Sequence, residues 1–236
     1  MSFTSRINRA LRRHIGVEIH KTRAGFDEAR NSVIKMKSVS LIVDGGANSG
    51  QYAMRIRREG YSGKILSIEP GAKAFEALVH HATNDLNWNC VKAALGAKND
   101  SMTLNLSSNE GMSSSLRKPG LHLIEFPTVT FDGGEVVNVI TLESLLTEVK
   151  ENVYLKLDVQ GFELEALQGI GSQLHKICVL ELEMTLVSMY EGESTLGEVL
   201  TFVESLGFFI FSISEFGKNK EGRVTYFDII AIKSDM

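Results

Sequence analysis

The chain has 236 residues, 43% of them apolar, which is enough for one sizeable buried core and too few for two full-sized catalytic domains. Its two cysteines, Cys90 and Cys178, lie far apart and belong to no CxxC or Cys/His pattern, which argues against a disulfide framework and a structural metal. No run approaches the roughly 20 apolar residues that cross a bilayer, and the N-terminus lacks the apolar stretch of a signal peptide, so we expect a soluble, cytoplasmic protein.

The net charge of −4 is distributed unevenly along the chain. Residues 1–37 hold nine Lys and Arg against three Asp and Glu, which leaves 16 against 26 for the remaining residues. Binding along a nucleic-acid backbone requires clustered positive charge. We therefore expect no nucleic-acid partner for the acidic part of the chain.

The basic N-terminal stretch, 1–37, is predicted to be a helical appendage to a catalytic domain over residues 38–236. Apolar residues recur every four positions and would form one stripe of a helix, with arginines on its other faces: Phe3, Ile7, Leu11 and Ile15. Such a helix could rest on a membrane surface through residues 1–16. The favoured interpretation is a cap that packs on the acidic domain or on a second subunit of a homo-oligomer.

From residue 41 onward, short runs rich in β-branched residues alternate with helical patterns, which is typical of parallel βαβ units. The predicted strands cover residues 41–43, 64–68, 90–95, 136–140, 153–157 and 177–182. The predicted helices cover residues 52–59, 141–149, 161–167 and 196–206, with one more around residues 75–79. Residues 208–213 and 225–232 are predicted to form a closing antiparallel pair. The whole pattern indicates a doubly wound, mostly parallel α/β sheet.

Two consecutive segments depart from this alternation. Residues 90–95 lead through a turn into the alternating Met102, Leu104 and Leu106, which predicts a hairpin. Residues 107–135 are rich in Ser, Gly and Asn, which predicts a long loop or lid with little regular structure.

The first strand ends in an acid and runs directly into a glycine-rich turn, 44–50, that leads into a helix. Such a turn lets the backbone and the helix N-terminus approach a ligand closely. The turn fails the dinucleotide fingerprint, because Ala47 or Asn48 stands at its second glycine position. The carboxylate of Asp44 would repel a pyrophosphate, but it suits the ammonium and sulfonium of S-adenosylmethionine.

Glu69 ends the next strand, where a ribose across the switch point offers two hydroxyls to a carboxylate. Together, Asp44 and Glu69 indicate binding of S-adenosylmethionine. The structural alternative is a plain tight turn with Asp44 as an N-cap and Glu69 in solvent.

The residues directly after the strand 153–157 narrow the choice of acceptor atom. Enzymes that methylate base amines generally carry an Asn/Asp-Pro-Pro-aromatic turn there, whereas this chain has Asp-Val-Gln-Gly at 158–161. Neither cysteine follows a proline, as the nucleophile of base-carbon methylation commonly does. A hydroxyl oxygen is therefore the favoured acceptor.

A hydroxyl acceptor needs a group that removes or polarises its proton, and Asp158 is the first candidate. Glu181 and Glu183 come next, because alternation places both on one face of their strand. With Asp158 they could instead hold a Mg²⁺ that acidifies the hydroxyl. His122, in the predicted lid, is a further catalytic candidate. The structural alternatives are a helix N-cap for Asp158 and salt bridges from the two glutamates to Lys156 or a neighbouring helix.

Six segments of the sequence match one known family: 42–50 (IVDGGANSG), 67–70 (SIEP), 94–96 (ALG), 112–116 (MSSSL), 141–145 (TLESL) and 156–163 (KLDVQGFE). On these segments the chain resembles the FkbM-type methyltransferases over roughly residues 40–210. The resemblance implies a Rossmann-like class I methyltransferase fold with a seven-stranded sheet, S-adenosylmethionine as donor, and O-methylation of sugars, glycans or secondary metabolites.

The resemblance also implies roles for residues of the matching segments. Asp44, Gly46 and Asn48 would contact the methionine end of the cofactor and Glu69 its ribose, while Asp158 and Glu163 would shape the site near the methyl group. The residues expected to bind the cofactor are Asp44, Gly45, Gly46, Ala47, Asn48, Gln51, Glu69, Pro70, Ala94 and Asp158.

Two other functions stay open on the sequence. One is an NAD-dependent nucleotide-sugar enzyme, which is disfavoured by the missing glycine and by the absence of a Tyr-x-x-x-Lys pair. The other is a catalytically silent relative that binds the cofactor, or nothing, and serves as a scaffold.

Overall fold

The structure of the chain is a computed structural model that describes residues 25–150 and 152–233. Its central sheet has the strand order β10-β11-β8-β7-β1-β2-β3, with β9 paired to β11. The bounds of its strands are β1 (Leu41–Gly45), β2 (Lys64–Ile68), β3 (Trp88–Val91), β7 (Val153–Leu157), β8 (Ile177–Thr185), β9 (Phe208–Ile213), β10 (Gly217–Lys218) and β11 (Val224–Lys233).

The pairing within this sheet confirms the predicted fold class. Strands β1, β2, β3, β7 and β8 are parallel, whereas β11 runs antiparallel to both β8 and β9. The closing antiparallel pair is therefore present as predicted. The two-residue strand β10 makes an eighth strand in the described part of the sheet, where seven were expected.

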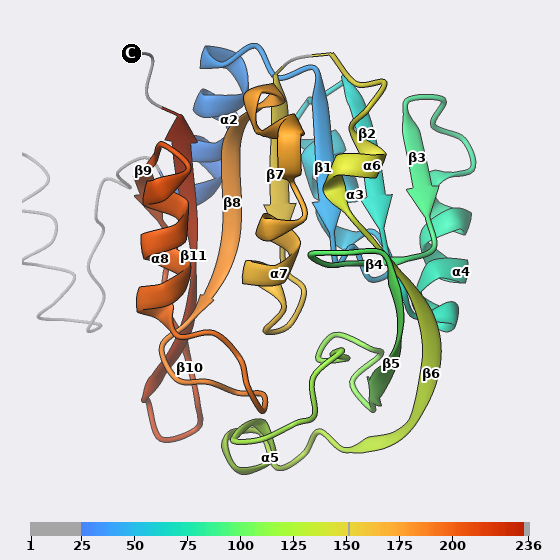
Figure 1. The fold of residues 1–236 in the computed structure, drawn as a ribbon, viewed down its shortest axis with the longest axis vertical. Coiled ribbons are helices and arrows are strands. Elements are labelled where there is room, and N and C mark those ends of the chain that lie inside the picture. Colours follow the sequence, from blue (N-terminus) through green and yellow to red (C-terminus); the bar gives the residue numbers. More distant parts are fainter. Residues whose placement is uncertain (1–24, 151, 234–236) are drawn as a thin grey trace, which may run out of the picture.

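Helices cover both faces of the sheet (Figure 1). On one face lie α2 (Phe26–Met36), α3 (Gln51–Arg58) and α4 (Ala72–Ala82), and on the other lie α6 (Leu142–Leu145), α7 (Glu163–Gln168), the 3-10 helix η1 (Gly171–Lys176) and α8 (Leu196–Ser205). Successive residues of a strand point to opposite faces, so Ile42 packs into the core under α2 and α3, whereas Val43 packs into the core under α7 and α8.

A second, three-stranded sheet has the order β4-β6-β5, with bounds β4 (Ala94–Leu95), β5 (Asp100–Ser107) and β6 (Phe131–Ile140). The predicted hairpin of 90–95 with the residues after it is wrong, because β5 pairs antiparallel with β6 and β4 pairs parallel with β6. The predicted loop 107–135 is also wrong over its last residues, 131–135, which belong to β6. Within that loop the chain forms a single short helix, α5 (His122–Glu125).

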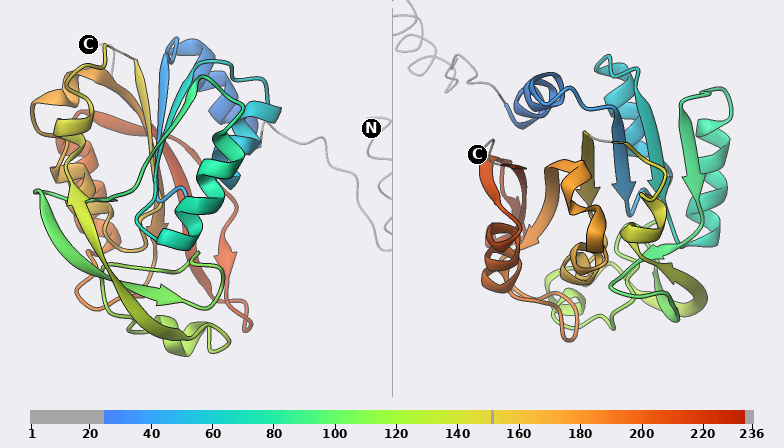
Figure 2. Two further views of the ribbon diagram at one scale, coloured as in Figure 1. Left: turned by 90° about the vertical axis from the view of Figure 1, so that its right-hand side faces the viewer. Right: turned by 45° about the horizontal axis from the view of Figure 1, so that its top comes forward.

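The second sheet and α5 lie beyond the carboxyl ends of β1, β7 and β8 (Figures 1 and 2). Parallel strands bring their carboxyl ends to one edge of a sheet, and in doubly wound folds ligands bind at this edge. The arrangement therefore places the lid segment over the expected ligand site.

Helix α2 belongs to the stretch that was predicted to be an appendage. Its Val33 and Ile34 are buried in the same core as Ile42 of β1, and Arg30 is 1% exposed. The apolar stripe at residues 3–15 and the predicted membrane contact of residues 1–16 lie outside the described residues. In the part of the chain that the structure describes, no helix has the length and apolarity to span a bilayer.

Candidate functional site

A cleft of about 730 Å³ lies at the carboxyl ends of the central strands. Eight of the ten residues predicted to bind the cofactor line it: Gly46, Ala47, Asn48, Gln51, Glu69, Pro70, Ala94 and Asp158. Of the catalytic candidates, Asp158, His122, Glu181 and Glu183 all line the same cleft. The cleft therefore brings together residues from the amino-terminal half, the lid and the carboxyl-terminal half of the chain.

The glycine turn is shaped by close backbone packing against the end of β7. Gly46 has a φ of +74°, and a Cβ atom there would collide with the carbonyl oxygen of Asp158. The amides of Gly46 and Ala47 both lie 3.0 Å from the carbonyl oxygen of Ile68, which ties the turn to the end of β2. Position 46 therefore requires glycine, and the turn exposes its backbone to the cleft.

Glu69 lies at the end of β2, and both of its carboxylate oxygens accept backbone hydrogen bonds. The amide of Asn48 donates to Oε2 at 2.9 Å, and the amide of Gly71 donates to Oε1 at 2.8 Å. Burial raises the pKa of Glu69 to about 7, against the pull of these two hydrogen bonds. Each carboxylate oxygen keeps a second lone pair, so the fixed carboxylate can still accept two hydroxyls from a ligand.

Asp44 and Gly45 lie beneath the wall of the cleft. Asp44 is fully buried, and its Oδ1 lies 3.2 Å from Nζ of Lys156, which is itself in the cleft wall. Neither oxygen of Asp44 accepts a well-oriented hydrogen bond from the described residues. Burial raises the pKa of Asp44, while the charge of Lys156 opposes that rise. The cofactor contacts predicted for Asp44 and Gly45 stay predictions.

The carboxylates of Asp158 and Glu183 are joined by the side chain of Gln160. The Nε2 of Gln160 lies 2.8 Å from Oδ1 of Asp158 and 2.9 Å from Oε2 of Glu183. The hydroxyl of Tyr190 lies 2.8 Å from Oε1 of Gln160. Burial and the neighbouring carboxylates, among them Asp158 and Asp228, raise the pKa of Glu183 well above its usual range.

Asp158 also faces a cation, because its Oδ2 lies 3.5 Å from Nζ of Lys156. Its side chain is 37% exposed, whereas that of Glu181 in the same cleft is 6% exposed. An exposed carboxylate held at a strand end is suited to accept a proton from a bound hydroxyl.

Glu181 lines the cleft, but its carboxylate is occupied by protein donors. Arg30 of α2 donates to both oxygens at 2.9 Å, and the hydroxyls of Tyr52 and Tyr154 donate to Oε2. Burial alone would raise the pKa of Glu181, but Arg30 and the two tyrosine hydroxyls together lower that pKa. Glu181 therefore holds α2 against the sheet through Arg30, which agrees with the predicted alternative of a salt bridge to a neighbouring helix. We assign Glu181 no role in proton transfer.

His122 is 5% exposed and lies among aromatic rings at the far side of the cleft. Its ring centroid is 5.1 Å from Phe126, 5.3 Å from Phe131 and 5.6 Å from Tyr190. Burial lowers the pKa of His122, which favours the neutral ring. Its Nδ1 is buried and has no hydrogen-bond partner among the described residues, so a ligand hydroxyl could pair with it.

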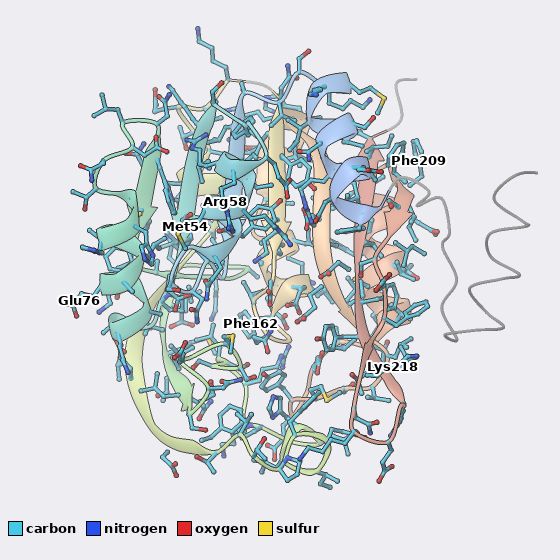
Figure 3. The ribbon with its side chains drawn as sticks, turned by 180° about the vertical axis from the view of Figure 1, so that it is seen from behind. Met54, Arg58, Glu76, Phe162, Phe209 and Lys218 are labelled. Carbon is cyan, nitrogen blue, oxygen red and sulfur yellow. The ribbon has the colours of Figure 1, made fainter. Side chains whose placement is uncertain are left out.

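Three cations surround the ring of Tyr52 on α3. The guanidinium carbons of Arg30 and Arg55 and the Nζ of Lys156 lie 5.3–5.4 Å from its centroid. Arg30 is paired with Glu181 and Lys156 with Asp44, whereas among the described residues Arg55 has an ion pair only with Asp27, at 3.8 Å. Arg55 and Arg58 of α3 line the cleft. Figure 3 labels Arg58 on this helix. This end of the cleft can therefore accept an anionic group.

The predicted Mg²⁺ site finds little support in these contacts. The described residues contain no group of three or more His, Cys, Asp or Glu that could hold a metal ion. The amide of Gln160 lies between Asp158 and Glu183, and Lys156 lies beside Asp158. A cation between Asp158 and Glu183 would have to displace the amide of Gln160 and lie close to the ammonium of Lys156, so these side chains do not favour a metal.

The sequence profile of one family, described as the methyltransferase FkbM domain, matches residues 44–210, which is more than half of the chain. The chain belongs to the FkbM methyltransferase family. As predicted, it is an S-adenosylmethionine-dependent methyltransferase with a class I fold.

Other comparisons place this FkbM methyltransferase among known proteins. The 2-O-methyltransferase NoeI of Sinorhizobium fredii is 26% identical over 192 residues, which cover 78% of this chain and 77% of NoeI. A precorrin-6y C5,15-methyltransferase from Geobacter metallireducens matches with a TM-score of 0.46 and 13% identity, covering 92% of this chain and 94% of its own. An rRNA methylase from Streptococcus thermophilus matches with a TM-score of 0.47 and 12% identity, covering 91% and 99%.

Several residues of the FkbM methyltransferase site were not among the sequence candidates: Arg55, Lys156, Gln160 and Tyr190. Lys156 could have been found, because it stands two residues before Asp158 and alternation places both on one side. Gln160 lies inside the most specific matching segment, KLDVQGFE. No sequence signal marks Tyr190, which reaches the site from the loop after β8.

Proposed function

We propose that this methyltransferase transfers the methyl group of S-adenosylmethionine to a hydroxyl oxygen of a sugar, glycan or secondary metabolite. The observation that carries the proposal is that Glu69 and Asp158 line one cleft on opposite sides of the glycine turn. A carboxylate that suits a ribose and a carboxylate that suits a hydroxyl proton thus share one cavity. The relative NoeI, named as a 2-O-methyltransferase, supports oxygen as the acceptor atom.

The charges along the cleft suggest how the cofactor lies. Its ribose hydroxyls would bind the carboxylate of Glu69, with the adenine beside Pro70 and Ala94. Its methionine carboxylate would face Arg55, whose ion pair with Asp27, at 3.8 Å, is longer than the pairs of Arg30 with Glu181 and of Lys156 with Asp44. The sulfonium would then lie toward Asp158, where negative charge stabilises it.

The transfer step is an in-line displacement on the methyl carbon. The hydroxyl oxygen of the acceptor forms the new bond to carbon, the carbon–sulfur bond breaks, and its electron pair stays on sulfur as the thioether of S-adenosylhomocysteine. The hydroxyl proton passes to the carboxylate of Asp158. Because the leaving group is good, positioning and exclusion of water supply most of the rate.

The acceptor would bind at the end of the cleft that carries both aromatic and acidic side chains. Phe126, Tyr190 and Tyr226 line this end together with Asp228 and Glu183. Aromatic faces can pack on the apolar face of a sugar ring, while carboxylates accept its hydroxyls. This combination supports a polyhydroxylated acceptor.

Two assays test the proposal. In calorimetry we expect S-adenosylhomocysteine to bind at micromolar concentration and NAD not to bind. With radiolabelled S-adenosylmethionine we expect label to enter one of a panel of methyl glycosides and oligosaccharides. Binding of NAD instead would reverse the cofactor assignment, and cofactor binding without transfer to any hydroxyl compound in a broad panel would favour the silent scaffold.

A further inference from the structure

Gln160 lies between the ends of β7 and β8, and its side-chain amide contacts three groups. Its Nε2 is within hydrogen-bond distance of both Asp158 and Glu183, and its Oε1 accepts the hydroxyl of Tyr190. A primary amide has two N–H donors, so both are used on carboxylates. Turning the amide over would place its oxygen against the oxygens of both carboxyl groups, and the repulsion from Asp158 favours the orientation in the structure.

The backbone of Gln160 is held in a conformation that costs free energy. Its φ of +53° lies in the left-handed region, which glutamine rarely adopts. The hydroxyl of Ser115 donates to the carbonyl oxygen of Gln160 at 2.7 Å, and Nε of Arg117 donates to that of Gly161 at 2.7 Å. The segment after β5 thus clamps this turn, and such strain commonly marks functional sites.

We propose that Gln160 is a positioning residue that holds the carboxylates of Asp158 and Glu183 in fixed places, so that Asp158 points at the acceptor hydroxyl. This inference rests on the proposed function. Without the amide, Asp158 would be left with its other neighbour, Lys156, 3.5 Å from Oδ2. The carboxylate would then turn toward the floor of the cleft, and Glu183 would repel it.

The length and charge of the side chain at position 160 both matter for this role. Asparagine is one methylene shorter and could not reach both carboxylates. Glutamate has the right length but adds a third negative charge. The surroundings already hold an excess of acids, because Asp228 of β11 and Glu163 of α7 also face Glu183, with Lys156 as the opposing cation.

The first test needs no acceptor. Carbon-13 NMR of carboxyl-labelled protein would follow proton uptake by the Asp158–Glu183 pair in the wild type, in Gln160→Leu and in Gln160→Glu. Loss of a hydrogen-bond donor to a carboxylate favours the protonated carboxyl group, so we expect the pH midpoint of the titration to rise in Gln160→Leu. It should rise further in Gln160→Glu, which adds a like charge. The matched control is Gln168→Leu, an exposed glutamine on α7, which should titrate as the wild type does. An unchanged midpoint in Gln160→Leu would overturn the proposal.

The second test uses an acceptor that the wild type methylates. We expect Gln160→Leu to lower kcat at least tenfold, with the affinity for S-adenosylhomocysteine unchanged within threefold. An unchanged kcat, despite a shifted midpoint, would also overturn the positioning role.

If Gln160→Leu fails to fold, Tyr190→Phe removes the hydroxyl that lies within hydrogen-bond distance of both Oε1 of Gln160 and the carbonyl oxygen of Ser113, and we expect a smaller shift in the same direction. An unchanged midpoint in that variant would count against the proposal. Failure of the proposed function is distinguishable, because the wild type would then methylate no hydroxyl compound whatever the titration shows.

Discussion

The ammonium of Lys156 lies 3.2 Å from Oδ1 of Asp44, at the junction of two parallel strands beneath the cleft. Asp44 is fully buried, and the side chain of Lys156 is 11% exposed. The positive charge of Lys156 therefore offsets the acid that was expected to face the cofactor. Further along the cleft, Glu183 and Asp228 have no ion pair with the described residues, and burial raises the pKa of both carboxyl groups.

This ion pair predicts a loss of stability when one partner is removed. Lys156→Met leaves Asp44 buried without its counter-charge, which should lower the free energy of unfolding by about 3–5 kcal/mol. Urea unfolding at pH 7.5 measures the change. The matched control is Lys98→Met, whose pair with Asp100 is exposed and screened by solvent, so the free energy of unfolding should stay close to that of the wild type. Equal effects of the two substitutions would contradict the assignment.

The pKa of Glu69 predicts a pH-dependent affinity for the cofactor product. The ionised carboxylate accepts ribose hydroxyls, so the affinity for S-adenosylhomocysteine should fall about tenfold as the pH is lowered from 8 to 6 through the pKa of about 7. Calorimetry measures the profile. Glu69→Gln should bind at least about tenfold more weakly and lose this dependence. Glu76→Gln, on the outer face of α4, should keep the wild-type profile (Figure 3).

The raised pKa of Glu69 also makes the stability of the ligand-free protein depend on pH. The pKa of Glu69 is higher in the folded chain than its ordinary value of 4.5, so the folded state binds this proton more tightly than the unfolded state does. The contribution of Glu69 to stability is therefore present below pH 4.5 and is lost as the pH rises through about 7. Thermal unfolding of wild type and Glu69→Gln across this range should show the difference, and parallel curves would count against it.

Arg55 is predicted to recognise the carboxylate of the methionine moiety. Arg55→Gln should weaken S-adenosylhomocysteine binding about tenfold or more, because a charge-assisted hydrogen bond contributes roughly 1.5–3 kcal/mol. Binding of 5′-methylthioadenosine, which lacks that carboxylate, should change less than about twofold by the same argument. Arg57→Gln is the control, since Arg57 pairs with Asp85 away from the cleft. Equal losses for both ligands would place the carboxylate elsewhere.

Asp158 is predicted to accept the acceptor proton. Asp158→Asn should keep its affinity for S-adenosylhomocysteine and lose turnover by about 100-fold or more, the usual size of a general-base contribution. Single-turnover rates with an acceptor that the wild type methylates measure the loss. The exposed Asp132→Asn, on β6, serves as control. A rate within threefold of wild type would remove Asp158 from this role.

The fold could be predicted where its signals are local. Strand β1, the glycine turn and α3 follow one another within 18 residues, from Leu41 to Arg58, and each carries its own pattern. Strand β5 was paired wrongly because its partner, β6, lies beyond a loop and carries Gly133 and Gly134 near its start, which hide the alternation. The sequence of a strand does not indicate which distant strand it pairs with.

The same distinction between local and long-range signals applies to the residues of the site. Glu69 and Asp158 could be found because each acid ends a strand whose pattern is clear. The binding of Glu181 by Arg30 could not, since 151 residues separate the two. Gln160 was overlooked because its amide side chain carries no charge. In the structure this amide joins two charged candidates, Asp158 and Glu183.

We propose that the cofactor lies across Glu69 and the glycine turn with its sulfur toward Asp158. A crystal structure of the full chain with S-adenosylhomocysteine tests this placement most directly. We predict both ribose hydroxyls within hydrogen-bond distance of the Glu69 carboxylate, and the homocysteine carboxylate on the Arg55 side of Tyr52. A ligand bound elsewhere, or one whose ribose makes no contact with Glu69, would contradict the account.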